Sequence, residues 1–177
     1  MHRADSVSQA GGLVVRRRAT FAVVGALSAA ALAGQVWAQA ERRVEWTDIA
    51  LIDGRVVRAA ELRAQAVVVE LWATWCPFCR KQNPYLQKLH ETAGGKGLMV
   101  LTFTIDDDIK LIRDYQRKYG YTFAAAPMTP QVERWFGKRR SLPELYVIDR
   151  SGRLVLREEG EMFPEDVAAL ARFAAGA

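Results

Sequence analysis

The sequence predicts an α/β domain built on a mixed β-sheet, because apolar strands alternate with helices along the chain. Ala66–Trp72 and Leu98–Ile105 are nearly continuous apolar runs, which is typical of parallel strands covered on both faces. The segment from Cys76 to about Thr92 between them is expected to be a helix. The turn residues 149–152 favour a hairpin that supplies the antiparallel edge of the sheet.

The other elements follow from caps and breakers. Arg43–Ile52 is expected to be extended, with a turn at Asp53-Gly54. Asp106–Asp108 offers N-cap residues for a helix that ends at Gly120, and a capped helix start explains these aspartates better than a cation site. The first two long strands should be parallel neighbours joined by a right-handed crossover. The remaining expected elements are a short helix over Pro130–Phe136, strands over Glu144–Ile148 and Arg153–Arg157, and a last amphipathic helix from Phe163 to about Ala174.

Residues 1–40 are predicted to be an export signal, with residues 41–177 forming one folded domain. Arg16–Arg18 form a cationic block, Ala19–Ala33 carries no charge, and small-x-small patterns follow up to Ala40, as in a secretory signal. The alternative is an uncleaved N-terminal anchor, although an anchor needs about 20 apolar residues and Gln35 interrupts this run. Both interpretations place the domain outside the cytoplasm, in a periplasmic or other extracytoplasmic compartment.

Charge and cysteine content exclude several classes of protein. The whole chain has a formal charge of +5, but residues 1–40 hold four arginines and one aspartate, so the predicted domain is only slightly basic. Composition therefore gives no support for nucleic-acid binding. Two cysteines are too few for a disulfide-dense scaffold or a four-cysteine zinc site. The domain is long enough to bury its own core.

The two cysteines form the motif Cys76-Pro77-Phe78-Cys79, directly after a buried strand and at a helix start. In that context a C-x-x-C pair indicates redox chemistry. The helix N-terminus stabilises a thiolate, so Cys76 is expected to be the exposed nucleophile. Cys79, one turn into the helix, is expected to be less exposed and to resolve the mixed disulfide.

The cysteine pair has two other interpretations, a structural disulfide and half of a metal site. A purely structural bridge over so short a loop would restrain little unfolded-chain entropy. A metal site would need further ligands, and His90, the single histidine of residues 41–177, lies about 16 Å along the same helix from Cys79 at 1.5 Å per residue. No metal is expected.

The segment Glu70–Arg80, with Trp-Ala-Thr-Trp before Cys76, resembles the active-site segment of the thioredoxin superfamily. The form is similar to the exported TlpA/ResA-like branch and to the thioredoxin-like proteins of cytochrome c maturation. Pro84 and the segment Leu142–Asp149 continue the resemblance, which covers about residues 46–173. It implies a thioredoxin fold, a central mixed sheet flanked by helices, and a thiol:disulfide oxidoreductase that needs no bound cofactor.

The resemblance also implies a substrate-binding loop. Pro143 takes the place of the family's cis-proline beside the cysteine pair, and Leu142 would offer backbone groups to a substrate peptide. Without the resemblance, Pro143 could equally be an ordinary proline opening an edge strand. Trp75 and Pro77, at the rim of the active site, are the other expected substrate contacts.

Three polar residues near this site can be compared with the family pattern, namely Glu70, Gln82 and Glu144. Glu70 falls where thioredoxins hold a buried acid, and such a carboxyl group could relay the proton of the resolving thiol. Burial is expected to raise the pKa of Glu70; the alternative is a strand residue facing solvent. Gln82 stands where both the TlpA/ResA-like proteins and the cytochrome c maturation proteins usually carry an acid. Glu144, which follows the proline, resembles the cytochrome c maturation proteins.

The run Lys138-Arg139-Arg140 precedes the proline loop. Most short charge runs are solvated faces. The alternative is a basic rim that steers acidic partners and favours the Cys76 thiolate.

Together these observations predict an exported thiol:disulfide oxidoreductase that reduces disulfides in envelope proteins, possible substrates being apocytochrome c or a copper-site protein. The family implies a transmembrane thiol shuttle as electron donor. The alternatives are an oxidant or isomerase, since Pro77 resembles those too, and a thioredoxin-fold metallochaperone, whose three-residue cysteine spacing and distal histidine are lacking. A peroxidase would need a threonine three residues before the reactive cysteine, where this chain has Ala73.

Overall fold

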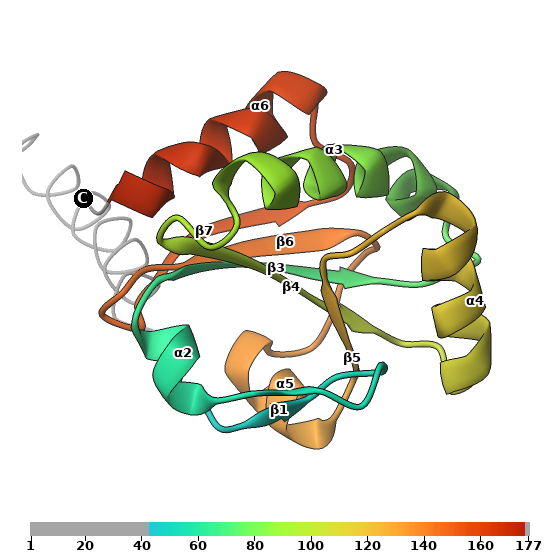
Figure 1. Ribbon diagram of the computed structural model, residues 1–177, viewed down its shortest axis with the longest axis horizontal. Coiled ribbons are helices and arrows are strands. Elements are labelled where there is room, and N and C mark those ends of the chain that lie inside the picture. Colours follow the sequence, from blue (N-terminus) through green and yellow to red (C-terminus); the bar gives the residue numbers. More distant parts are fainter. Residues whose placement is uncertain (1–42, 176–177) are drawn as a thin grey trace, which may run out of the picture. The chain divides into compact units, whose positions relative to one another are not determined.

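The computed structural model describes residues 43–175, and the predicted export signal lies outside them. Figure 1 shows a central sheet with strands in the order β5-β4-β3-β6-β7. The strands β3 (Ala66–Trp72), β4 (Leu98–Thr104) and β5 (Ala124–Pro127) are parallel. The hairpin of β6 (Glu144–Ile148) and β7 (Leu154–Glu159) pairs antiparallel with β3 through β6. The predicted mixed sheet, parallel central pair and antiparallel edge are therefore confirmed.

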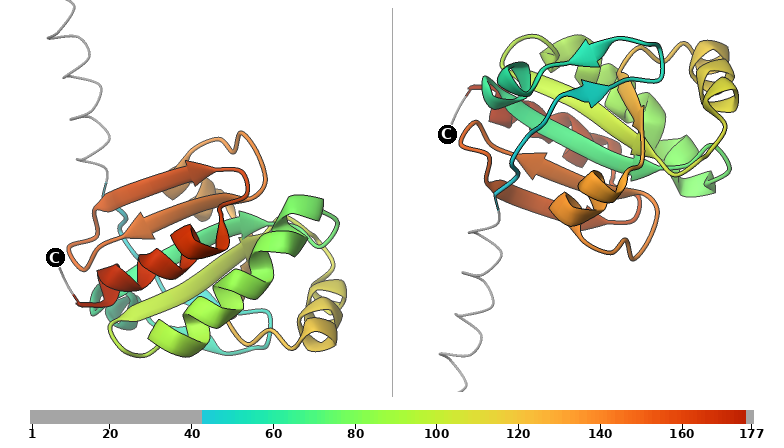
Figure 2. Two further views of the ribbon diagram at one scale, coloured as in Figure 1. Left: turned by 90° about the horizontal axis from the view of Figure 1, so that it is seen from above. Right: turned by 90° about the horizontal axis from the view of Figure 1, so that it is seen from below.

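Helices cover both faces of this sheet. The helix α3 (Pro77–Ala93) lies beside α6 (Pro164–Ala169) on one face, as the left view of Figure 2 shows. The opposite face carries α2 (Ala59–Arg63), α5 (Pro130–Phe136) and the small hairpin of β1 (Ile49–Ala50) and β2 (Val56–Val57). The helix α4 (Ile109–Tyr119) stands at the end of the sheet where β3 and β4 finish.

The core follows the strand period of two. In β3, Val67, Val69 and Leu71 pack into the cluster beneath α5, whereas Val68 packs into the cluster beneath α3. Both clusters are fully buried along this strand, which explains its unbroken apolar sequence.

Several predicted elements needed correction. The strand β5, the hairpin of β1 with β2, and α2 were not anticipated, because they are short and β5 consists of three alanines and a proline. Only the end of Arg43–Ile52 forms a strand, and the turn at Asp53-Gly54 is confirmed, with Gly54 at a φ of 90°. The last helix is shorter than expected, since residues after α6 form a 3-10 helix, Leu170–Ala175.

None of the helices within residues 43–175 has the length and apolar character needed to cross a membrane.

Candidate active site

The cysteine pair lies at the start of α3, just after the short connection that follows β3. Cys76 is the N-cap of α3 and Pro77 occupies its first turn, so the helix begins at the motif itself. Cys76 and Cys79 form a disulfide with Cα atoms 5.3 Å apart. The backbone N–H of Cys79 donates to Cys76 Sγ over 3.1 Å, so an unpaired donor of the helix end points at this sulfur.

The exposure of the pair differs from expectation. Cys76 is only 2% exposed and Cys79 is fully buried, so the prediction of an exposed Cys76 is wrong for the disulfide form. Both sulfurs are locked into a bridge and pack with Trp72 and Ile112, which removes them from water. The exposed neighbours are instead aromatic: Trp75 is 62% exposed and Phe78 51%.

An open groove runs past Cys76. It is bounded on one side by the motif residues Trp75, Pro77 and Phe78, and on the other by the loop before β6. The Leu142–Pro143 peptide bond is cis, as predicted, and Leu142 lines the same groove as Cys76. The lining is completed by Ile105 and by three further residues of the loop before β6, namely Arg139, Arg140 and Ser141.

The three residues of the basic run Lys138-Arg139-Arg140 differ in position, so part of the run fits a basic rim and part fits a solvated surface. Arg139 and Arg140 line the groove, and Arg140 also pairs with Glu159 over 3.2 Å. Lys138 is exposed and is absent from the groove lining. Two of the three cations therefore lie beside the cysteine pair, as a basic rim requires.

Glu144 holds this loop in place. Its fully buried carboxylate accepts hydrogen bonds from the backbone N–H of Arg140 (2.7 Å), from the Tyr146 hydroxyl (2.6 Å) and from the Arg157 guanidinium (3.3 Å). A weaker bond comes from the N–H of Ser141 over 3.4 Å. Although burial acts in the opposite direction, these donors hold the pKa of Glu144 below its ordinary value. The charged carboxylate anchors the start of β6 to the loop that carries the cis-proline.

Glu70 is buried completely, on the α3 side of β3. Its Oε1 accepts one hydrogen bond, 2.9 Å from Gln82 Nε2, while its Oε2 has no partner among the described residues. Burial raises the pKa of Glu70 to about 8, and the bond from Gln82 only partly opposes this effect. The solvent-facing alternative for Glu70 is therefore wrong.

Gln82 connects this acid to two other parts of the site. It lies one helical turn after Cys79, and both side chains are fully buried. Its Oε1 accepts a 2.7 Å hydrogen bond from the N–H of Met162, in the loop before α6. The amide that departs from the family pattern thus holds Glu70 with its nitrogen and a distant loop with its oxygen.

Sequence reasoning missed the role of Asp106. It caps no helix, because the N-cap of α4 is Asp108, which accepts from the N–H groups of Lys110 and Leu111. Asp106 instead accepts from the N–H and hydroxyl of Thr74, both at 2.8 Å, and from the hydroxyl of Thr104 at 2.6 Å. These bonds fix the chain just before Trp75. Threonines at the ends of two adjacent strands were the signal that could have indicated this role.

Within residues 43–175, no group of three or more histidine, cysteine, aspartate or glutamate side chains is arranged to hold a metal ion.

Comparisons with known proteins agree with this geometry. The Redoxin family matches residues 44–172, well over half of the chain. "Thiol-disulfide oxidoreductase ResA" of Bacillus thuringiensis (strain Al Hakam) is 25% identical over 116 residues, covering 66% of this chain and 67% of the relative. Its namesake in Geobacillus thermodenitrificans is 26% identical over 117 residues, with the same coverage of both proteins.

Solved structures share the fold. A thioredoxin-family thiol:disulfide interchange protein from Chlorobium tepidum TLS superimposes with a TM-score of 0.70 at 24% identity, covering 76% of this chain and 96% of the other. StoA from Bacillus subtilis gives a TM-score of 0.61 at 16% identity, covering 69% and 92%. The disulfide at the start of α3, the cis peptide bond before Pro143 and these relatives lead to one conclusion: the chain belongs to the Redoxin family and is a thiol:disulfide oxidoreductase of the thioredoxin fold.

Proposed function

We propose that this protein is an exported reductant that opens disulfides in envelope proteins, with Cys76 as the attacking thiol. The observation that carries the proposal is the position of Cys76 at the start of α3, where it receives the N–H of Cys79 and lines the same open groove as Leu142. A donor aimed at the sulfur stabilises its thiolate once the bridge is reduced. Cys76 is the cysteine of the pair that lines the groove, whereas Cys79 is fully buried and absent from the groove lining.

The reaction balances as two thiol–disulfide exchanges. The Cys76 thiolate attacks one sulfur of the substrate disulfide, and the other substrate sulfur leaves as a thiolate that takes up a proton. Cys79 then loses its proton and attacks Cys76, which releases the second substrate thiol and re-forms the Cys76–Cys79 disulfide. We assign Glu70 as the acceptor of the Cys79 proton, supported by its burial and its link to Gln82 on the same face of α3. A dithiol donor, which we propose to be a membrane thiol shuttle, returns two electrons to the pair.

The groove supports a polypeptide substrate. Trp75 and Pro77 form one wall, Leu142 the other, and the cis-Pro143 loop is held rigidly through Glu144. Apocytochrome c and copper-site proteins are the substrate classes we propose to test first. The pattern of residues 1–40 supports export, and fractionation of cells that make the full chain would test it: recovery with a cytoplasmic marker would contradict this part of the proposal.

The equilibrium of the Cys76–Cys79 pair with glutathione separates reductant from oxidant. A reductant has a potential near the reducing end of the known range, which spans about −270 to −120 mV for disulfide catalysts. We expect the pair to stay oxidised in all but strongly reducing glutathione mixtures. Easy reduction of the bridge would instead support the oxidant or isomerase alternative, for which Pro77 is the supporting residue.

Trapping experiments test the order of attack. Cys79→Ser should accumulate mixed disulfides with envelope proteins, whereas Cys76→Ser should not, because only Cys76 lines the groove. The two variants serve as matched controls, since each keeps one thiol. Trapping by Cys76→Ser alone would reverse the assignment.

A further inference from the structure

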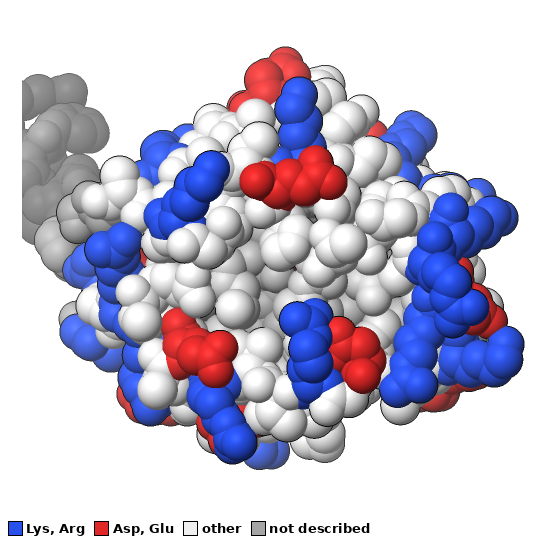
Figure 3. Space-filling model, in the orientation of Figure 1, with Lys and Arg blue, Asp and Glu red and all other residues white. Residues whose placement is uncertain are grey.

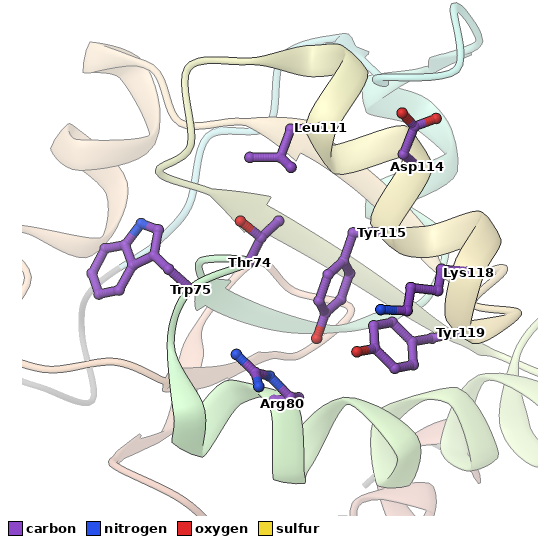
Figure 4. A pocket seen from close by; sticks show the side chains of 8 residues that line it. All are labelled: Thr74, Trp75, Arg80, Leu111, Asp114, Tyr115, Lys118 and Tyr119. Carbon is purple, nitrogen blue, oxygen red and sulfur yellow. The ribbon is translucent and has the colours of Figure 1, made fainter.

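Trp75 separates two hollows on the active-site face. One is the groove that contains Cys76 and Leu142. The other lies on the opposite side of the indole, between the start of α3 and the exposed side of α4. Figure 4 shows Trp75 and Thr74 at one end of this second hollow and the tyrosines of α4 at the other. We call it the α4 hollow; it is lined by Thr74, Trp75, Arg80, Leu111, Asp114, Tyr115, Lys118 and Tyr119.

The walls of the α4 hollow are aromatic and apolar. Tyr115 packs on Trp72 and on Tyr119, with ring centroids 5.3 and 4.7 Å apart, so the floor is anchored to the core. Leu111 is 48% exposed and Tyr119 41%, which leaves large apolar surface open to solvent. Exposed apolar groups gathered in a concave surface are typical of a contact site.

The rim of the α4 hollow is basic. Arg80 extends into it from α3, between Trp75 and Tyr115 (Figure 4), and Lys118 lies over the ring of Tyr119. The one acid, Asp114, is already shared by Lys110 and Arg117 at 2.7 and 3.2 Å. Among the described residues, no carboxylate pairs with Arg80 or Lys118. Figure 3 shows the surrounding surface over α4 as predominantly basic.

We propose that the α4 hollow is a second docking site for the disulfide substrate, and that it takes a substrate segment with an aromatic or large apolar side chain next to a carboxylate. The apolar side chain would lie on Tyr115, Tyr119 and Leu111, and the carboxylate would pair with Arg80. Charge complementarity selects this occupant, since the free cations of the hollow need an anion and its walls need an apolar group. The inference rests on the proposed attack by Cys76 and names the class of substrate that this attack favours.

The spacing limits where the docking residues lie in the substrate. Arg80 is four residues after Cys76 on α3, which is about 6 Å along the helix axis. An extended peptide advances about 3.3 Å per residue, so the carboxylate should follow or precede the substrate cysteine by roughly two residues.

The test uses the Cys79→Ser protein and synthetic peptides with one cysteine, each carried as a mixed disulfide with a chromophoric thiol. In the measured step, Cys76 attacks the peptide sulfur, a protein–peptide disulfide forms, and the chromophoric thiolate leaves. Three peptides differ only at the two docking positions: Asp-Phe, Lys-Phe and Asp-Ala. Rates are compared as ratios between peptides, which cancels any change in the intrinsic reactivity of Cys76.

We expect Asp-Phe to react about tenfold faster than Lys-Phe at low salt, with the difference shrinking as salt rises. Arg80→Gln should reduce this ratio by about two- to fivefold, the size typical of an exposed ion pair. Tyr119→Ala should instead reduce the ratio of Asp-Phe to Asp-Ala by about two- to tenfold. Lys88→Gln, which removes an exposed cation from the same helix outside the hollow, is the matched control and should leave both ratios unchanged.

Equal rates for the three peptides, or equal losses in Arg80→Gln and Lys88→Gln, would overturn the docking site while leaving the attack by Cys76 intact. Failure of every peptide to react would instead overturn the proposed function, and the docking site with it. The two failures are therefore distinguishable in one set of measurements.

Discussion

Two glutamates on neighbouring strands are equally buried and yet differ in ionisation. Glu70 on β3 and Glu144 on β6 are both 0% exposed. Glu144 receives donors from a tyrosine, an arginine and the loop backbone, and the pKa of its carboxyl lies below the ordinary value. Glu70 receives one amide donor and its pKa is raised to about 8.

The difference shows that burial alone does not decide the protonation state of an acid. Desolvation raises the pKa of both carboxyl groups, and the tyrosine, arginine and backbone donors around Glu144 reverse this effect where the single amide beside Glu70 does not. Glu144 is thus suited to act as a fixed anchor for the cis-proline loop. Glu70 is suited to exchange a proton near neutral pH, as a relay to Cys79 requires.

The largest expected effect is on stability as a function of pH. The unfolded carboxyl of Glu70 releases its proton near 4.5 and the folded one near 8, so the folded state holds the proton more tightly. The stability this provides is complete below pH 4.5 and is lost as the pH rises through 8, by on the order of 5 kcal/mol, at about 1.4 kcal/mol per pKa unit. Glu70→Gln, which cannot ionise, should escape this loss and be more stable than wild type at pH 9.

Denaturant unfolding of the oxidised proteins at pH 5, 7 and 9 measures this. Glu158→Gln is the matched control, because Glu158 lies exposed on β7. The control should follow wild type at every pH. If Glu70→Gln also follows wild type, Glu70 has an ordinary pKa and the contrast with Glu144 disappears.

Glu144→Gln should have the next largest effect, with the opposite sign. The substitution removes the negative charge that faces Arg157 and places an amide NH2 group, itself a donor, among the donors that surround the carboxylate. We therefore expect the free energy of unfolding to fall by about 2–3 kcal/mol at pH 7. Because the folded pKa of Glu144 is depressed, its stabilisation is present above about pH 4.5 and is lost as the pH falls through the folded value.

Glu159→Gln provides the comparison for this variant. Glu159 pairs with Arg140 and Arg157 too, but at the surface, where an ion pair contributes less than about 1 kcal/mol. Equal unfolding free energies for Glu144→Gln and Glu159→Gln would show that the buried carboxylate of Glu144 stabilises the fold no more than a surface ion pair does.

Gln82→Ala should have the smallest effect on stability, about 1–2 kcal/mol, since it removes two hydrogen bonds and leaves the N–H of Met162 unpaired. Loss of the donor should raise the pKa of Glu70 further, because the bond from Gln82 opposes the effect of burial. The pH at which the mixed disulfide resolves should therefore move upward in stopped-flow measurements. The same shift in a Glu70→Gln background would show that Gln82 acts by another route.

Much of the fold could be predicted from the sequence, because its long elements carry strong local signals. Ala66–Trp72 and Pro130–Phe136 lie where expected, since an apolar run and a proline at a helix start each specify one structure. The strand Ala124–Pro127 could not be found this way, because small residues give no periodicity. It exists through pairing with β4, which is a tertiary effect.

The site was predictable to a similar degree. The Cys76–Cys79 disulfide and the cis bond before Pro143 are as the motif and the resemblance implied, and the burial of Glu70 followed from its apolar strand. The burial of Cys76 and the bond from Gln82 to Met162 were not predictable, since both depend on contacts between distant segments.

The most direct test of the difference in ionisation between Glu70 and Glu144 is a pH titration of both carboxyl groups in one sample of the oxidised protein. The side-chain carboxyl carbons of glutamate are isotopically labelled and followed by NMR. The Glu70→Gln and Glu144→Gln variants assign the two signals. We expect the Glu70 signal to move with a midpoint at about pH 8, while the Glu144 signal titrates below its ordinary range. A Glu70 midpoint near 4.5, alongside that of the exposed glutamates, would contradict the assignment, because a carboxylate with an ordinary pKa is too weak a base to take the Cys79 proton efficiently near neutral pH.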